Sequence, residues 1–365
     1  MPFNVTESLD VEMSNKTVDT GPAQEDLEFI TYGIFVPVVM TFGYIGNIIT
    51  AIVLWKKEMA SITNLFLRAL VVSDIALVTF ASIALSLPTL VSKLVHRDLG
   101  FHVLLPHGFK TIDYLALTSQ LCNEYILVFV SIERYIAICH PMKHIYIHSR
   151  KKVLYSIAGI ICFALCYNVP RIISTEIQLT SCFDESYPLD CYVIKLSDFG
   201  NGFFYKSVYV VWMYTVIYFG IPLLSLLSLN ILILRKLSKM RSRRRSLEAC
   251  SSRVKKENTT ILIVIIVIVF TICQTLGLFN QFQFLINKEK ANASVQTNLT
   301  VIINFLYVMN SSINFIIYIC VGKKFRRTFM VIFGIEDWNC RITSCFSGVE
   351  DYRVKSVSTN TASVL

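Results

Sequence analysis

Charged residues are scarce in this 365-residue chain, since they make up 16% of it, whereas a soluble domain carries about a quarter. Hydrophobic residues make up 54%, and the mean hydropathy is +0.57. The shortage of charge excludes an ordinary soluble domain and indicates a membrane protein. The chain also lacks an internal repeat, which argues against a transporter because many transporters are built from repeats.

Other absences narrow the class of function. The last apolar segment, 299–320, contains no lysine, which excludes the Schiff base of a retinal protein. The six histidines lie in loops or at segment ends, and we find no Ser/His pair or His/Asp metal cluster within the apolar segments. We therefore expect no enzyme activity. Residues 1–28 also lack the apolar core of a cleavable signal peptide.

Seven apolar segments are long enough to cross a bilayer, whose hydrocarbon core is ~30 Å thick. They cover roughly 29–55, 62–90, 110–138, 153–173, 205–235, 259–286 and 299–320. The expected fold is all-α, a seven-transmembrane helix bundle over 29–322. Residues 323–333 (KKFRRTFMVIF) alternate basic and apolar residues and predict a short amphipathic helix on the inner membrane surface, followed by a cytoplasmic tail, 334–365.

Charge is distributed unevenly between the two ends of these segments. Residues 1–28 carry seven acids and one lysine, whereas the loops after the third and fifth segments are rich in Lys and Arg. Because cytoplasmic loops favour Lys and Arg, we expect a multi-pass plasma-membrane protein with the N-terminus outside and the C-terminus inside. The net charge of +9 then reflects topology and contact with membrane lipid, and not a nucleic-acid partner.

Four sequons on the predicted outer side indicate glycosylation, at Asn4, Asn15, Asn292 and Asn298. Of the eleven cysteines, only Cys182 and Cys191 fall in an extracellular loop, where they are expected to form a disulfide; two free thiols are the alternative. Cys340 and Cys345 follow the amphipathic helix and are candidate palmitoylation sites.

Polar side chains within the apolar segments indicate a functional site in the bundle interior, because placing them in contact with lipid is energetically costly. The first group comprises Asn47, Asp74, Asn123, Asn310, Ser311 and Asn314. Asn310 and Asn314 are four residues apart and Ser311 follows Asn310, so one helix face presents all three. At the end of the third segment, Glu133 and Arg134 form an opposite-charge pair that suits a two-state switch; the alternative is a surface arginine that snorkels.

The motifs GN, LVVSD, ERY…HP, a proline in the fifth segment and NFIIY occur in this order, each in its own segment. In this combination the chain resembles the rhodopsin-like (class A) G-protein-coupled receptors over most of its length. It is similar in particular to the invertebrate FMRFamide-type neuropeptide receptors, in LALTSQ…ERYIAICHP, CYNVPRIISTEI and NSSINFIIYICVGKKFRRTF. The alternatives are a class A receptor for another peptide or small ligand, and then a channel or transporter.

The resemblance implies a peptide ligand, a G-protein partner and arrestin capture after phosphorylation of the tail. It implies a G-protein switch at Glu133, Arg134, Tyr135, Asn230, Asn314 and Tyr318. It also implies a sodium ion at Asp74, with Asn47, Asn123, Asn310, Ser311 and Asn314 around it, and no other cofactor.

A ligand that ends in Arg-Phe-amide, as the resemblance implies, needs a carboxylate for its guanidinium group. The candidate acids are Asp113, Glu176, Asp184 and Glu185, and the candidate amides and hydroxyl are Gln120, Asn168, Asn280, Gln281, Asn304 and Tyr307. Any one of the loop acids could instead be merely solvated.

The chain departs from the family pattern at several positions. Phe109 replaces the usual cysteine, so the usual bridge from the third helix must be absent, and Phe315 replaces the proline of the seventh helix. The sixth helix reads FTICQTL, with Gln274 and Leu276 in place of tryptophan and proline, so we expect it to be straighter or to bend near Gly277. Asn230 stands where many members place a tyrosine.

Glu124 is a further departure, because the family places an apolar residue there. No lysine or arginine is expected at its depth, so we expect a neutral carboxyl group that donates a hydrogen bond. We interpret Glu124 and Gln274 as a pair that substitutes for the missing aromatic switch. The alternative is a glutamate bonded to a nearby backbone carbonyl, with no role in switching.

Overall fold

The computed structural model describes residues 26–94, 105–142, 144, 149–184, 187–244, 251–286 and 293–334, which are largely helical. The α-helices are α3 (Val36–Leu54), α4 (Ile62–Leu94), α6 (Leu105–Cys139), α8 (Arg150–Ile173), α9 (Asp198–Asn201), α10 (Ile221–Arg244), α11 (Ser251–Ile286), α12 (Ala293–Ser312), α13 (Asn314–Val321) and α14 (Lys323–Phe333). π-Helical segments cover Phe29–Phe35, Phe204–Met213 and Thr215–Gly220, a 3-10 turn covers Lys57–Met59, and the strands are β1 (Thr175–Asp184) and β2 (Tyr187–Leu196).

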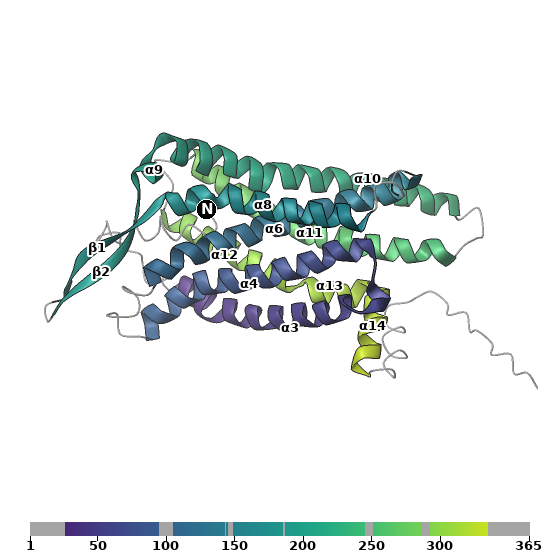
Figure 1. Cartoon of the computed structure of the whole chain (residues 1–365), viewed down its shortest axis with the longest axis horizontal. Coiled ribbons are helices and arrows are strands. Elements are labelled where there is room, and N and C mark those ends of the chain that lie inside the picture. Colours follow the sequence, from purple (N-terminus) through teal and green to yellow (C-terminus); the bar gives the residue numbers. More distant parts are fainter. Residues whose placement is uncertain are drawn as a thin grey trace, which may run out of the picture.

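The helices form a membrane-spanning bundle. Six of the described helices are long and apolar enough to cross a membrane, and the bent pair α12 and α13 makes a seventh span. Figure 1 shows them side by side in an elongated bundle, with the β1–β2 hairpin at one end and α14 near the other. We call these the hairpin end and the α14 end. The seven-span bundle expected from the sequence is confirmed, and α14 covers the same residues, 323–333, as the expected amphipathic helix.

The burial pattern differs from that in a soluble domain, because the bundle has an apolar core and also exposes large apolar side chains and buries many polar ones. Large apolar side chains face outward, and Phe42, Tyr155 and Leu224 are 70%, 74% and 67% exposed. Polar side chains face inward, and Asn47 and Asp74 are each 1% exposed. This pattern suits a lipid solvent, in which polar groups must find partners inside the protein.

The hairpin-end half of the fifth span is π-helical, and this sets where its tyrosines point. Tyr205, Tyr209, Tyr214 and Tyr218 recur at intervals of four or five residues. In an α-helix, Tyr205 and Tyr214 would point in opposite directions, because nine residues make about two and a half turns. The wider π-turn closes hydrogen bonds five residues apart and brings all four to one side. All four are buried, from 9% exposed at Tyr205 to 0% at Tyr218.

The sixth and seventh spans differ in shape. α11 is continuous from Ser251 to Ile286, in line with the absence of a proline. The seventh span bends by 41° between α12 and α13, although Phe315 replaces the family's proline. Two glycines of α3 allow this region to approach closely: a Cβ on Gly43 would lie 2.3 Å from Ser312 Oγ, and one on Gly46 would lie 2.9 Å from Phe315 Cβ.

The antiparallel β1–β2 hairpin, which the sequence analysis did not anticipate, connects α8 to the fifth span. Its register places Cys182 opposite Leu189 and Cys191 opposite Thr180, so the two cysteines lie diagonally across the strands. Their side chains lie outside the described residues, and the disulfide stays a prediction.

Candidate functional site

A cluster of buried polar side chains lies where α3, α4, α6 and the seventh span meet. Asn123 Nδ2 donates a hydrogen bond to Asp74 Oδ1 at 2.9 Å, and Asn314 Nδ2 donates to Asp74 Oδ2 at 2.7 Å. Ser311 extends the cluster, because its hydroxyl accepts from Asn123 at 3.2 Å and its carbonyl accepts from Asn47 at 3.0 Å. The structure thus joins five residues from four different spans.

The composition of this cluster fits a small hard cation. Among the described residues, Asn47 Oδ1 and Asn123 Oδ1 are buried without a hydrogen-bond partner, which is costly for an acceptor. Together with the Asp74 carboxylate and the Ser311 hydroxyl they form an all-oxygen set, the kind that hard cations prefer. Asn310, the sixth expected member, is only half-buried.

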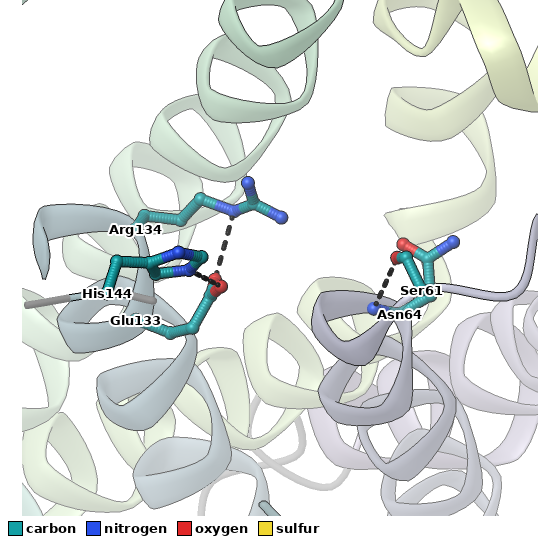
Figure 2. A network of polar contacts seen from close by, with 5 residues as sticks. All are labelled: Ser61, Asn64, Glu133, Arg134 and His144. Atoms are coloured by element: carbon teal, nitrogen blue, oxygen red, sulfur yellow. Dashed lines mark hydrogen bonds and ion pairs between the residues drawn. The ribbon is translucent and has the colours of Figure 1, made fainter. Parts of the chain in front are cut away.

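Glu133 is the centre of a small network of polar contacts near the α14 end of α6. Its Oε2 lies 3.4 Å from Arg134 Nε, and its Oε1 lies 3.2 Å from His144 Nε2. Figure 2 shows both contacts converging on the one carboxylate. Arg134 is 8% exposed, so it is buried in the bundle and does not snorkel at the surface. In the same view the Ser61 hydroxyl accepts from the Asn64 backbone N–H at 3.2 Å and caps the first turn of α4.

No side-chain hydrogen bond or ion pair joins the other expected switch residues to Arg134 within the described residues. The Tyr135 hydroxyl lies 3.4 Å from His140 Nε2, and Asn230 Nδ2 donates to the carbonyl of Leu226 at 2.7 Å. Tyr318 is buried and stacks on Phe325 of α14, with ring centroids 5.3 Å apart. Its hydroxyl has no hydrogen-bond partner in the part of the chain that the structure describes. A cooperation of Tyr318 with Arg134 in another conformation stays a prediction.

Towards the hairpin end, the tyrosines of the fifth span pack against a buried arginine. The Arg171 guanidinium carbon lies 5.4 Å from the centroid of the Tyr214 ring, and Tyr214 stacks on Tyr218 at 4.4 Å. Asp113 of α6 is an acid that interacts electrostatically with Arg171. Asp113 Oδ1 is buried and has no hydrogen-bond partner among the residues described. The carboxylate therefore keeps an unused acceptor.

The remaining pocket candidates are buried and bonded inside the bundle. The donor–acceptor pairs are Gln120 to Glu124, Tyr218 to Asn168, Asn280 to Thr300, Gln281 to the carbonyl of Val210, Asn304 to Tyr32, and Tyr307 to Gln274. Three amide oxygens, those of Gln120, Asn280 and Asn304, have no partner within the described ranges. With Asp113 Oδ1, they are buried acceptors without a donor in the described part of the chain, where the hydroxyls of Tyr167 and Tyr214 are also unpaired.

The hairpin acids are placed differently from Asp113. Glu176 is exposed on β1, where its Oε1 accepts from Gln178 Nε2 at 2.5 Å. Asp184 ends β1, but its side chain lies outside the described residues, as does Glu185 altogether. Of the four candidate acids, Asp113 is thus the one shown to lie among the helices.

The structure places Glu124 and Gln274 in direct contact. Gln274 Nε2 donates to Glu124 Oε1 at 2.5 Å, between α6 and α11. Gln120 Nε2 also donates to Glu124 Oε1, so the described partners of Glu124 are two amide side chains, and Glu124 accepts both bonds. The donated bond that we expected, like the backbone carbonyl of the alternative interpretation, has no counterpart among the described residues, because Oε2 is unpaired there. A role in switching is a separate matter and stays a prediction.

Most predicted modification sites lie outside the described residues, namely Asn4, Asn15, Asn292, Cys340 and Cys345. Asn298 lies within α12, half-buried and with its Oδ1 shielded from solvent. A glycan would be attached to the other amide atom, Nδ2, so the glycosylation of Asn298 stays a prediction.

Sequence reasoning assigned no role to Arg171, to His144 or to the tyrosines of the fifth span. A signal for Arg171 was present, since an arginine within an apolar segment needs a partner. The tyrosine spacing gave no comparable signal, because it fits one helix face only if the helix is π-helical.

Comparison with known proteins agrees with this geometry. A family model described as 7 transmembrane receptor (rhodopsin family) matches residues 46–318, which is more than half of the chain. The chain is 28% identical to the FMRFamide receptor of Drosophila melanogaster over 309 residues, 84% of this chain and 54% of that receptor. It therefore spans about half the length of that relative.

Two further relatives match this chain over most of their own length. An FMRFamide peptide receptor of Caenorhabditis elegans is 27% identical over 332 residues, 90% of this chain and 73% of its own. The growth hormone secretagogue receptor type 1 of Mus musculus is 26% identical over 310 residues, 82% of this chain and 79% of its own.

Proposed function

This chain belongs to the rhodopsin family of seven-transmembrane receptors, and from that premise we propose that it is a G-protein-coupled receptor for an extracellular neuropeptide. The ligand class that we propose is an amidated, RFamide-like peptide. The observation that carries this proposal is the similarity, over 84% of the chain, to a protein named FMRFamide receptor.

The chemistry of the hairpin-end half supports a donor-rich ligand. Asp113 Oδ1 and the amide oxygens of Gln120, Asn280 and Asn304 are buried acceptors that lack donors in the described part of the protein. An arginine side chain offers five N–H donors, and a terminal carboxamide offers two more. A peptide with both groups would satisfy acceptors that the bundle leaves unpaired.

On the α14 end we propose a heterotrimeric G protein as the partner. The Glu133–Arg134 pair would hold the resting conformation, and its opening would release Arg134 for the partner. The basic loops after α6 and α10 support a cytoplasmic position for this end, and hence an extracellular N-terminus in the plasma membrane. Lipid contact through α14 and acylation of Cys340 and Cys345 belong to the same proposal.

Expression in cultured cells tests the receptor proposal. A panel of amidated peptides would be screened against calcium and cyclic-AMP readouts, with each peptide's free-acid form as its control. We expect at least one amidated peptide with a penultimate arginine to activate, and its free acid to be weaker. Activation by unrelated peptides alone would overturn the assignment of the ligand class.

A second candidate function is a receptor for a different peptide. The observation that favours it is the 26% identity to the growth hormone secretagogue receptor type 1 and to neuromedin-U receptor 2, both of Mus musculus. Including peptides of these two classes in the same screen separates the two candidates.

For the polar cluster we propose a sodium ion that favours the resting conformation. Sodium is expected to lower agonist affinity in membranes, whereas Asp74→Asn, which removes the charged oxygen ligand, should abolish that effect. The measurement is agonist competition in sodium chloride against choline chloride at equal ionic strength. If wild-type affinity does not respond to sodium, this assignment fails.

For the tail we propose arrestin capture after phosphorylation of a Ser/Thr cluster, Ser356, Ser358, Thr359, Thr361 and Ser363, which lies outside the described residues. Phosphorylation would make this segment strongly anionic. Truncation after Gly348 is expected to slow agonist-driven internalisation while peptide binding stays unchanged. Fluorescence imaging of the tagged receptor measures it, and normal internalisation of the truncated chain would contradict the proposal, leaving an inert tail.

A further inference from the structure

A chain of buried hydrogen bonds links the third, sixth and seventh spans at mid-bundle. Gln120 Nε2 and Gln274 Nε2 both donate to Glu124 Oε1, at 3.1 and 2.5 Å. Gln274 Oε1 in turn accepts from the Tyr307 hydroxyl at 2.8 Å. The four side chains are at most 3% exposed, so water does not compete for these bonds.

Gln274 occupies a special place in this chain because it is bonded on both sides. Its amide nitrogen donates to α6 and its amide oxygen accepts from α12, so one side chain of α11 contacts two neighbouring helices. An apolar or aromatic residue there could not make both bonds. Any displacement of α11 away from α6 and α12 must therefore break two buried hydrogen bonds together, and unpaired buried polar groups are costly.

Gly277, one turn further along α11, makes the contact with Tyr307 sterically possible. A Cβ on Gly277 would lie 2.4 Å from the Tyr307 hydroxyl and 2.8 Å from Phe219 Cε1. A larger residue would push Tyr307 away from α11. The glycine thus serves close packing between helices, since α11 is continuous through this position.

Gln120 connects this chain of bonds to the candidate ligand pocket. Its amide nitrogen donates to Glu124, while its amide oxygen is buried without a partner among the described residues. A ligand N–H that donates to that oxygen would hold or reorient the amide group. Because the nitrogen of the same amide donates to Glu124, the Gln120–Glu124 hydrogen bond would change with it.

We propose that Glu124, Gln274 and Tyr307 form a latch that holds α11 against α6 and α12 in the resting conformation, with Gln120 as its connection to the ligand. Release of Gln274 frees α11 to move at the α14 end, where the Glu133–Arg134 pair lies. The latch is a two-state element, because its two bonds form or break as a unit. The link to signalling rests on the proposed receptor function, whereas the latch itself concerns the unliganded chain.

A double-mutant cycle with Gln274→Leu and Tyr307→Phe tests the latch. Each change removes one or both buried bonds and is expected to shift the ligand-free equilibrium towards the released conformation by about fivefold per neutral bond. Tyr307→Phe should have no further effect in the Gln274→Leu background, because its partner is already gone. The readouts are basal signalling and the distance between spin labels at the α14 ends of α6 and α11 in purified, ligand-free protein.

Control variants separate a latch from a general loss of packing. Tyr44→Phe removes a hydroxyl bond to Thr79 between α3 and α4, and Thr275→Val removes a bond within α11 next to Gln274. Neither control should change the label distance. Glu124→Leu should lengthen it, whereas Glu124→Gln, which retains an acceptor at Oε1, should rescue the wild-type distance.

Two outcomes would overturn the latch. One is additivity of Gln274→Leu and Tyr307→Phe in both readouts. The other is a lowered melting temperature with unchanged label distances, which would assign these bonds to stability alone. Because the label distances need no ligand or G protein, they report on the latch even if the receptor proposal fails.

Discussion

Replacement of Arg134 by alanine is expected to abolish G-protein activation while the affinity for the activating peptide is unchanged. Arg134 lies at the α14 end of α6, far along the helix from Asp113 and the tyrosines of the fifth span, so a ligand bound near them would not contact it. Its guanidinium group is buried, and its Nε lies 3.4 Å from Glu133 Oε2, so Arg134 is paired in this conformation and must leave Glu133 before it can contact a G protein. Nucleotide exchange on added G protein and radioligand competition in the same membranes measure the two effects.

Arg68 provides a matched control for this experiment. It is also partly buried, donates to the carbonyl of Leu54 at 3.0 and 2.7 Å, and lies over the Trp55 ring. Arg68→Ala removes a similar side chain from a neighbouring helix, and we expect signalling to survive it.

Glu133→Gln should raise basal signalling by about tenfold, because the charge-assisted contact that holds Arg134 is lost. Unimpaired signalling by Arg134→Ala would remove the proposed switch.

Replacement of Asp113 by asparagine is expected to lower the potency of an arginine-containing amidated peptide by about 10- to 100-fold. A charge-assisted hydrogen bond contributes about 1.5–3 kcal/mol, and the unused Oδ1 of Asp113 is the acceptor that the ligand guanidinium would take. A peptide with citrulline in place of arginine, which keeps the shape and loses the charge, should show the same loss on the wild-type receptor. Its potency should then fall little further on Asp113→Asn.

Glu176→Gln serves as the control for Asp113, because Glu176 is exposed on β1 and already accepts from Gln178. We expect it to change potency little. Arg171→Gln is informative in the same assay, because it removes the cation that interacts with Asp113. A loss of potency relative to the wild-type receptor would show that Arg171 supports ligand binding by Asp113. A large loss of potency on Glu176→Gln with none on Asp113→Asn would show that the ligand guanidinium group binds to an acid of the hairpin and not to Asp113 in the bundle.

The sequence alone determined the class of the molecule, because the membrane imposes strong local rules. Long apolar segments must be helices, since lipid offers no partner for a free backbone group. For the same reason the rare polar residues could be assigned to the interior, and the structure places Asp74 with Asn123, Asn314 and Ser311. The end of the last span and the helix at 323–333 could also be predicted locally, because a continuous apolar segment gives way there to alternating basic and apolar residues.

Only the tertiary structure decided how these elements contact one another. The π-helical course of the fifth span, and with it the burial of Tyr205 and Tyr214 on one side, has no local sequence signal that separates it from an α-helix. The pairing of Gln274 with both Glu124 and Tyr307 joins residues up to 150 positions apart in the chain, from α6 to α11. Local rules act over a few residues, whereas the partner of a buried polar group depends on which helices pack together. That is why the sequence placed these side chains inside the bundle and only the packed structure showed what each of them binds.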